Sequence, residues 1–85
     1  MDYTRLGKRI KEERLRLNLT QEKLSEKVGI STAYLGQIER GERCITLDKL
    51  IPLANYLGVT VDFLLTDYIA VSYTHLRAHE TLSDL

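Results

Sequence analysis

The chain has 85 residues, of which 44% are hydrophobic and 28% are charged. This length suits a single domain, and this composition excludes a disordered chain and a membrane-spanning one. The formal net charge is zero, but residues 1–43 carry ten lysines and arginines against seven aspartates and glutamates. The N-terminal half is therefore mildly basic, which suits a surface that faces nucleic acid.

The sequence also bears on the membrane and the compartment. Every uncharged run, Tyr68 to Leu76 among them, is too short to cross a bilayer, and no apolar signal-peptide core follows Met1. Cys44 is the single cysteine, so no internal disulfide is expected, as in a reducing cytoplasm. We therefore predict a cytoplasmic protein without a membrane segment.

Apolar residues recur at helical spacing from the N-terminus on. The spacing predicts a first helix from about Thr4 to Leu17, with Leu6, Ile10 and Leu17 facing inward. Asn18 is expected to end this helix, because asparagine tolerates the left-handed backbone conformation that often follows a helix.

A second, shorter helix is predicted after Thr20, whose side chain suits the N-cap position. Leu24 and Val28 lie four residues apart on its buried face, and Gly29 is expected to end it.

The third helix is predicted to begin after Ser31, a second N-cap. It continues to about Arg40 and stops at Gly41, and Leu35 and Ile38 are its inward residues.

Thr46 is the next predicted cap, and Gly58 is expected to end the fourth helix. Pro52 lies inside this segment, where a proline costs about 3 kcal/mol unless the helix bends, so we expect a kink or a late helix start. The predicted inward face consists of Leu47, Leu50, Ile51, Ala54 and Leu57.

Thr60 is predicted to cap a short fifth helix from Val61 to Leu65. Phe63 is expected in the core beneath the first helix, and the alternative is a dimer contact. Because no stretch before the C-terminal end alternates as a strand does, the predicted fold is all-α, with five helices in one domain.

Two short helices joined by a tight, glycine-containing turn form a helix-turn-helix unit, here Thr20 to Gly41. The unit has the sequence TQEKLSEKVGISTAYLGQIERG, and the fourth helix ends in the segment LANYLGV. With these segments the chain resembles the XRE-type helix-turn-helix family, the lambdoid phage repressor and Cro group, from about Leu6 to Leu65. The resemblance implies a compact, lambda-repressor-like DNA-binding domain and a transcriptional regulator, most often a repressor. It also implies a homodimer on double-stranded DNA, with a pseudo-palindromic operator.

The predicted third helix offers Thr32, Ala33 and Gln37 on its outward face. A helix fits the major groove of B-DNA, where Gln37 can pair with adenine through two hydrogen bonds. Ala33 and the Thr32 methyl group can contact a thymine methyl, and the Thr32 hydroxyl can donate or accept. The alternative for Gln37 is an ordinary solvated side chain.

Other polar residues are candidate contacts for DNA phosphates. Gln21 begins the second helix, where its amide and the backbone N–H groups suit an anion, and the resemblance implies that this glutamine contacts the DNA backbone. The further candidates are Ser31, Tyr34, Arg40 and Arg43. Each has a structural alternative: Ser31 caps its helix, Tyr34 can lie over the helix surface, and the two arginines can be ordinary solvated charges.

The resemblance implies one structural ion pair as well. In the family an arginine late in the first helix pairs with the glutamate that ends the third, and Arg14 and Glu39 stand at these positions. Pairing would neutralise Glu39, whose free charge would repel phosphates. We therefore assign this pair to the scaffold and not to base recognition.

No arrangement of residues in the sequence predicts catalysis. The chain lacks a recognisable Ser/His/Asp or Cys/His set, glycine-rich phosphate loop or carboxylate pair, so we expect no enzyme activity, no cofactor and no metal site. His75 and His79 have the i, i+4 spacing of half a helical metal site. Both lie in the C-terminal segment, which we exclude for a separate reason.

The segment from Val71 to Thr81, VSYTHLRAHET, matches the in-frame translation of a transposon-end sequencing adapter. We therefore expect a native domain over residues 1–69 and an adapter-derived, non-native tail over residues 70–85. A natural continuation beyond Tyr68 stays open.

Two other functions stay open. The chain could be the antitoxin-type module of a toxin–antitoxin pair, which captures a protein partner as well as DNA. An exposed apolar surface on the fourth and fifth helices would favour that hypothesis. The chain could also be the regulatory arm of a larger enzyme, although nothing in residues 1–69 supports this.

Overall fold

N-capping residues mark where four of the five helices begin. In the computed structural model, which describes residues 2–66, the side-chain oxygens of Thr20, Ser31 and Thr60 accept hydrogen bonds of 2.9–3.0 Å from backbone N–H groups in the first turn that follows. Thr46 has the extended backbone of a cap but makes no such bond. Its hydrogen bond to Asp48 instead lowers the pKa of that carboxyl. Each predicted cap therefore does precede a helix.

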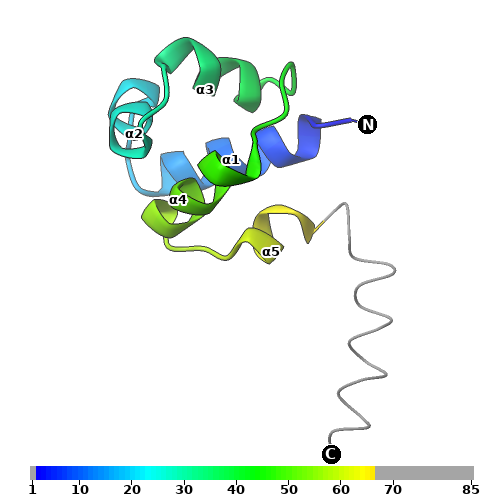
Figure 1. Cartoon of the computed structure of the whole chain (residues 1–85). Coiled ribbons are helices and arrows are strands. Elements are labelled where there is room, and N and C mark those ends of the chain that lie inside the picture. Colours follow the sequence, from blue (N-terminus) through cyan, green and yellow to red (C-terminus); the bar gives the residue numbers. More distant parts are fainter. Residues whose placement is uncertain (1, 67–85) are drawn as a thin grey trace, which may run out of the picture.

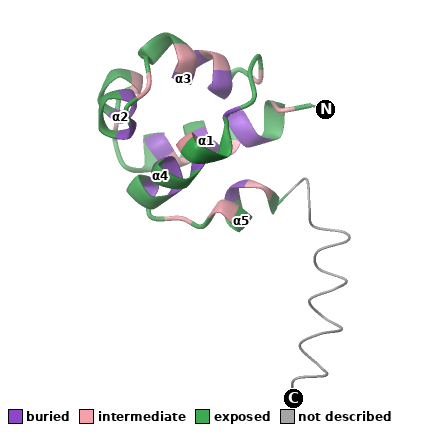
Figure 2. Cartoon of the chain, viewed as in Figure 1, coloured by how far each residue is buried: buried purple, intermediate pink, exposed green. Residues whose placement is uncertain are grey.

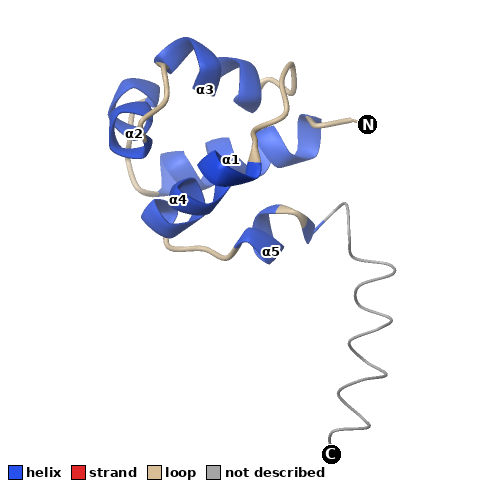
Figure 3. Cartoon of the chain, viewed as in Figure 1, coloured by secondary structure: helices blue, strands red, loops and turns tan. Residues whose placement is uncertain are grey.

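The described residues form five α-helices and no strand, which confirms the predicted all-α fold (Figures 1 and 3). Apart from the late start considered for α4, no predicted helix end differs from the observed one by more than a residue. The described helices are too short or too polar to cross a membrane. The predicted domain boundary at residue 69, the tail and both histidines lie outside the described residues. The helices are α1 (Thr4–Arg16), α2 (Gln21–Val28), α3 (Thr32–Glu39), α4 (Leu47–Leu57) and α5 (Val61–Leu64).

Two left-handed residues set the direction of the chain around the helix-turn-helix unit. Asn18, with φ of 59°, ends the turn after α1 as predicted. Gly29, with φ of 83°, ends α2 and sends the chain toward the Ser31 cap of α3. A residue with a Cβ atom adopts this conformation only at a cost, which glycine avoids.

One hydrophobic core lies between the helices, and their buried faces turn toward it (Figure 2). Each helix contributes at least one side chain to this core, and Ile45 enters it from the loop before α4. The core consists of Leu6, Ile10, Leu24, Val28, Leu35, Ile38, Ile45, Leu50, Leu53, Ala54, Leu57 and Leu64.

The predicted inward face of α4 is wrong at two positions. Leu47 and Ile51 are exposed, at 61% and 45%, whereas Leu53, which the prediction left out, is fully buried. Leu50, Leu53, Ala54 and Leu57 form the buried stripe. Leu47 and Ile51 also have helical spacing, so periodicity could not decide which stripe the neighbouring helices cover.

Two further apolar residues lie differently from the prediction. Leu17 is 37% exposed, because it follows the last turn of α1, and Leu19 packs against the core instead. Phe63 is not core but 39% exposed. It does lie beside α1, where the Arg9 guanidinium stands 5.3 Å from its ring centroid, and Leu64 is the buried residue of α5.

Pro52 does not delay the start of α4. The helix begins at Leu47 and continues through the proline, so the predicted late start is wrong and the predicted bend stays a prediction. A residue with an N–H at this position would bond to the Asp48 carbonyl. Pro52 and Asp48 are both exposed, so water can take the place of the missing donor.

Gly7 allows α1 and α3 to approach closely. A Cβ atom at this position would lie 2.7 Å from the carbonyl oxygen of Glu39 and would overlap that of Ile38. Both opposing atoms belong to the backbone at the end of α3, so they cannot move aside as a side chain would. Gly7 therefore sets the distance between these two helices.

Gly7→Ala is expected to lower the free energy of unfolding by about 1–3 kcal/mol, because the added methyl group overpacks this contact. Helix propensity alone predicts the opposite sign, a gain of about 1 kcal/mol. Urea unfolding followed by circular dichroism measures the change.

Gly36→Ala is the matched control, because Gly36 is also a buried helical glycine. Its Cβ would lie 3.1 Å from Nη1 of Arg40, at the movable end of a long side chain. Its stability should stay the same or rise by up to about 1 kcal/mol. A gain in both variants would contradict the role assigned to Gly7.

Candidate nucleic-acid interface

α3 lies at the outer edge of the molecule (Figure 1). α1 packs against both α3 and α5 and lies between them. Leu35 and Ile38 anchor the inner side of α3 in the core, next to Leu24 of α2. This packing of α2 against α3 across the Gly29 turn forms the predicted helix-turn-helix unit and leaves the other side of α3 uncovered by described elements.

The structure places the three candidate base contacts on the uncovered side of α3. Thr32 and Ala33 are exposed, and Gln37 is half-buried. The side chain of Gln37 makes no hydrogen bond to any residue between positions 2 and 66, so its amide keeps its donors and its acceptor. The geometric condition for a recognition helix is therefore met at these positions.

The hydroxyl group of Thr32 is partly occupied. Its Oγ1 lies 3.1 Å from Oγ of Ser25 in α2, and the Ser25 hydroxyl donates to the carbonyl oxygen of Glu22 at 3.0 Å. Ser25 has one hydroxyl hydrogen, so Thr32 must be the donor in the pair. In this arrangement the Thr32 hydrogen points to Ser25, and a contact of the Thr32 hydroxyl with a base stays a prediction. Its oxygen can still accept, and its methyl group stays available.

Sequence reasoning missed Ser25, which is buried and joins the two helices of the unit. A serine inside a helix next to apolar residues gave no signal by itself. Its contact with Thr32 depends on the angle between α2 and α3, which only the folded chain defines.

Arg14 and Glu39 form the predicted ion pair. Nε of Arg14 lies 2.7 Å from Oε2 of Glu39, and the two side chains are only 9% and 2% exposed. Arg14 also donates to the carbonyl oxygen of Leu19 at 2.8 Å, and Gln21 donates to Oε1 of Glu39 at 2.9 Å. The pair thus connects α1, the turn after it, α2 and the end of α3.

Arg14→Met is expected to lower the free energy of unfolding by about 3–5 kcal/mol, because the buried carboxylate of Glu39 loses its countercharge. Glu13→Gln is the control, since Glu13 pairs with Arg16, whose side chain is 53% exposed. That change should cost no more than about 1 kcal/mol. If thermal unfolding shows the same loss of stability in both variants, the buried pair stabilises the fold no more than the partly exposed one.

Arg40 and Arg43 lie at the C-terminal end of α3 and in the loop after it. Nε of Arg40 is 2.9 Å from Oε2 of Glu42. This pairing lowers the pKa of the Glu42 carboxyl and raises the pKa of Arg40. Because both side chains are more than half exposed, a phosphate can compete with Glu42 for the guanidinium group.

Arg43 stands over the ring of Tyr34, with its guanidinium carbon 5.2 Å from the ring centroid. The Tyr34 hydroxyl donates to the carbonyl oxygen of Cys44 at 3.5 Å, and the ring packs against the core. Tyr34 therefore supports the loop after α3 and holds Arg43. Its phosphate contact stays a prediction, as do those of Arg40, Arg43 and Ser31.

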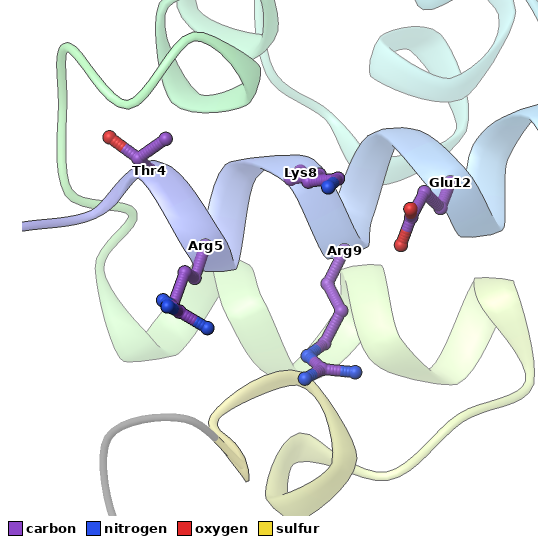
Figure 4. Close-up of a pocket in the computed structure, with 5 residues that line it drawn as sticks. All are labelled: Thr4, Arg5, Lys8, Arg9 and Glu12. Atoms are coloured by element: carbon purple, nitrogen blue, oxygen red, sulfur yellow. The ribbon is translucent and has the colours of Figure 1, made fainter.

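A second basic cluster lies on α1, where Thr4, Arg5, Lys8, Arg9 and Glu12 line a shallow hollow (Figure 4). The side chains of Arg5 and Arg9 extend from α1 on the side away from α3 (Figure 4). The stacking of Arg9 on Phe63 of α5 agrees with this direction. Arg5 and Arg9 therefore point away from the surface formed by α2, α3 and the loop after it, although Thr4 of the hollow lies against Gly41 of that loop.

Comparison with known proteins agrees with the observed fold and with the helix-turn-helix unit. The model of the helix-turn-helix family matches residues 10–64. The chain is 49% identical over 49 residues to the control protein C.SmaI of Serratia marcescens, and the match covers 58% of each protein. The chain thus spans little more than half the length of that relative.

Two solved structures are similar over most of their length. The restriction-modification controller protein C.AhdI of Aeromonas hydrophila is 32% identical with a TM-score of 0.70, over 73% of this chain and 94% of that one. The P22 c2 repressor, solved with a synthetic operator, is 32% identical with a TM-score of 0.68, over 69% of this chain and 89% of that one. These similarities confirm the resemblance inferred from the sequence.

Proposed function

This chain belongs to the helix-turn-helix family, and on that premise we propose that it is a transcriptional regulator that binds double-stranded DNA with α3 in the major groove. The observation that carries the proposal is the position of Thr32, Ala33 and Gln37. They lie on the uncovered side of a helix whose opposite side is anchored by Leu35 and Ile38. An eight-residue helix at the edge of a domain can enter the groove with its N-terminal side chains against base edges.

The residues around α3 supply contacts for phosphates. Gln21 lies at the first position of α2, and Arg40 and Arg43 lie beyond the other end of α3. Such contacts set the register of the protein on DNA and carry little sequence information. The P22 c2 repressor, similar over 69% of this chain, was solved with operator DNA, which supports the proposal.

We propose repression as the regulatory outcome and a homodimer as the binding species. Two copies would place one α3 in each half-site of a pseudo-palindromic operator, with half-site centres about 34 Å apart. The proposed role requires binding alone, without catalysis. The single free thiol of Cys44 suits a reducing compartment, and we place the protein in the cytoplasm.

The antitoxin alternative predicts an exposed apolar surface on α4 and α5, and four exposed apolar residues do lie on these helices, but they do not form one patch. Leu47 and Ile51 lie on one edge of α4, whereas Tyr56 lies on the opposite side, given 100° per residue. Phe63 of α5 lies under Arg9. The exposed apolar residues are therefore scattered, as on most soluble surfaces.

Gln37→Ala is expected to weaken binding to the preferred operator by about 1–3 kcal/mol, because it removes a two-bond contact with adenine. Affinity for unrelated DNA should hardly change. Fluorescence anisotropy on both duplexes measures this, after selection of the operator from random sequences. Asn55→Ala removes an exposed amide from α4 and should change neither affinity. An equal loss on all sequences would refute base recognition by Gln37.

Glu42→Gln is expected to tighten DNA binding on every sequence, because it releases Arg40 for a phosphate. The slope of log affinity against log salt should steepen by up to about one, as for an added phosphate contact. Glu26→Gln is the control, since it removes the same charge from an exposed position late in α2. The proposed competition at Arg40 fails if both variants change the slope alike.

A further inference from the structure

Three hydrogen bonds converge on the carboxylate of Glu39. Its Oε2 accepts from Nε of Arg14 at 2.7 Å, and its Oε1 accepts from Nη2 of Arg14 at 3.1 Å and from Nε2 of Gln21 at 2.9 Å. The Glu39 side chain is only 2% exposed, so water competes little for these bonds. A carboxylate has two acceptor oxygens and no donor, and therefore it can satisfy all of these groups at once.

The bond from Gln21 fixes the end of a side chain at the molecular surface. Gln21 is half-buried at the start of α2. Its amide nitrogen carries two N–H donors, so the bond to Glu39 leaves one donor and the amide oxygen for another partner. The amide of Gln21 lies over Gly36 of α3, at ordinary van der Waals distance from where a Cβ of that residue would be.

We propose that Glu39 is a positioning residue for DNA binding, which holds the Gln21 amide in the orientation that contacts a backbone phosphate. The inference rests on the proposed function and gives Glu39 a role beyond its ion pair with Arg14. Glu39 does not touch DNA and acts through Gln21. By holding a long side chain in place before binding, it removes part of the cost of ordering that side chain in the complex.

Positioning and simple electrostatics predict opposite changes in DNA affinity when Glu39 loses its carboxylate. Glu39 carries a negative charge close to the surface that would meet phosphates. If its charge alone mattered, removing it would tighten DNA binding. If Glu39 positions Gln21, removing the carboxylate weakens binding instead.

The test measures DNA affinity of Glu39→Gln, Gln21→Ala and the double variant by fluorescence anisotropy, on the selected operator and on an unrelated duplex. Glu39→Gln replaces one acceptor oxygen by an amide nitrogen, which is a donor. In either orientation of the amide, its N–H groups face a donor of Arg14 or Gln21, so at least one hydrogen bond is lost. We expect this variant to bind both duplexes about three- to tenfold more weakly, the size of one lost hydrogen bond. In the Gln21→Ala background the same change should have no effect. Glu42→Gln, which removes an exposed charge, should bind more tightly.

A second variant separates positioning from folding, because Glu39→Gln also disturbs the buried pair. Arg14→Met combined with Glu39→Leu removes both charges, leaves no unpaired charge in the interior and keeps the net charge at zero. All affinities are measured at a temperature where thermal unfolding shows each variant folded. The same loss of affinity, again absent when Gln21 is alanine, supports the inference.

Two results overturn it: wild-type affinity in the Arg14→Met/Glu39→Leu variant, or tighter binding by Glu39→Gln. Either result leaves the proposed function intact, because the wild-type chain still binds DNA. If the wild-type chain binds neither duplex, the proposed function itself fails.

Discussion

The contact between α1 and the C-terminal end of α3 determines where the candidate interface lies. At Gly7 the two backbones approach so closely that even a methyl group would overlap the carbonyl oxygens of Ile38 and Glu39. About two helical turns further along α1, Nε of Arg14 lies 2.7 Å from Oε2 of Glu39. A steric stop and a buried ion pair thus hold the same end of α3 from the same side. Because α3 cannot rotate about its axis without breaking both, the side that carries Ala33 and Gln37 is kept outward.

This arrangement also explains how a chain of zero net charge can present a surface suited to phosphates. Two glutamates lie at the end of α3 and in the loop after it, and neither is a free charge. Glu39 is buried against Arg14, and Glu42 is paired with Arg40 at 2.9 Å. The first pair is closed to solvent, so DNA cannot exchange it. The second is exposed, so a phosphate can replace Glu42. The net charge of the chain therefore does not predict the electrostatic potential at this interface. That potential depends on which charges are paired with each other.

Local chemistry made most of the fold predictable. The caps at Thr20, Ser31 and Thr60 and the left-handed turn at Asn18 depend on residues close in sequence, and all were found as predicted. The clearest error, in α4, concerns which of two adjacent stripes of apolar residues the neighbouring helices cover. Ile51 was placed inward and is exposed, whereas Leu53 is buried. Hydrophobic spacing fixes the helical period but not the rotation of the helix against its neighbours, which is set by the packing of all five helices.

Sequence reasoning had a similar limit in the candidate nucleic-acid interface. The Arg14–Glu39 pair followed from the family resemblance, but the bonds from Ser25 to Thr32 and from Gln21 to Glu39 did not. These residues lie 7 and 18 positions apart, and their side chains meet only because α2 and α3 cross at one particular angle. Polar contacts between helices require atomic positions, whereas capping and periodicity do not.

The polar contacts between α2 and α3 also reduce the number of α3 residues that are available for base recognition. The Thr32 hydroxyl lies 3.1 Å from that of Ser25, and the Gln21 amide and the Arg40 guanidinium lie beside Gly36. On the proposed function, Ala33, Gln37 and the Thr32 methyl group would supply the main direct contacts. One two-bond contact discriminates between bases by about 1–3 kcal/mol, whereas specific sites typically exceed non-specific DNA by about 4–10 kcal/mol. A single such contact falls short of that range, and the two contacts of a symmetric site, together about 2–6 kcal/mol, would reach its lower part. The small recognition surface thus itself argues for a two-fold complex, independently of what related proteins do.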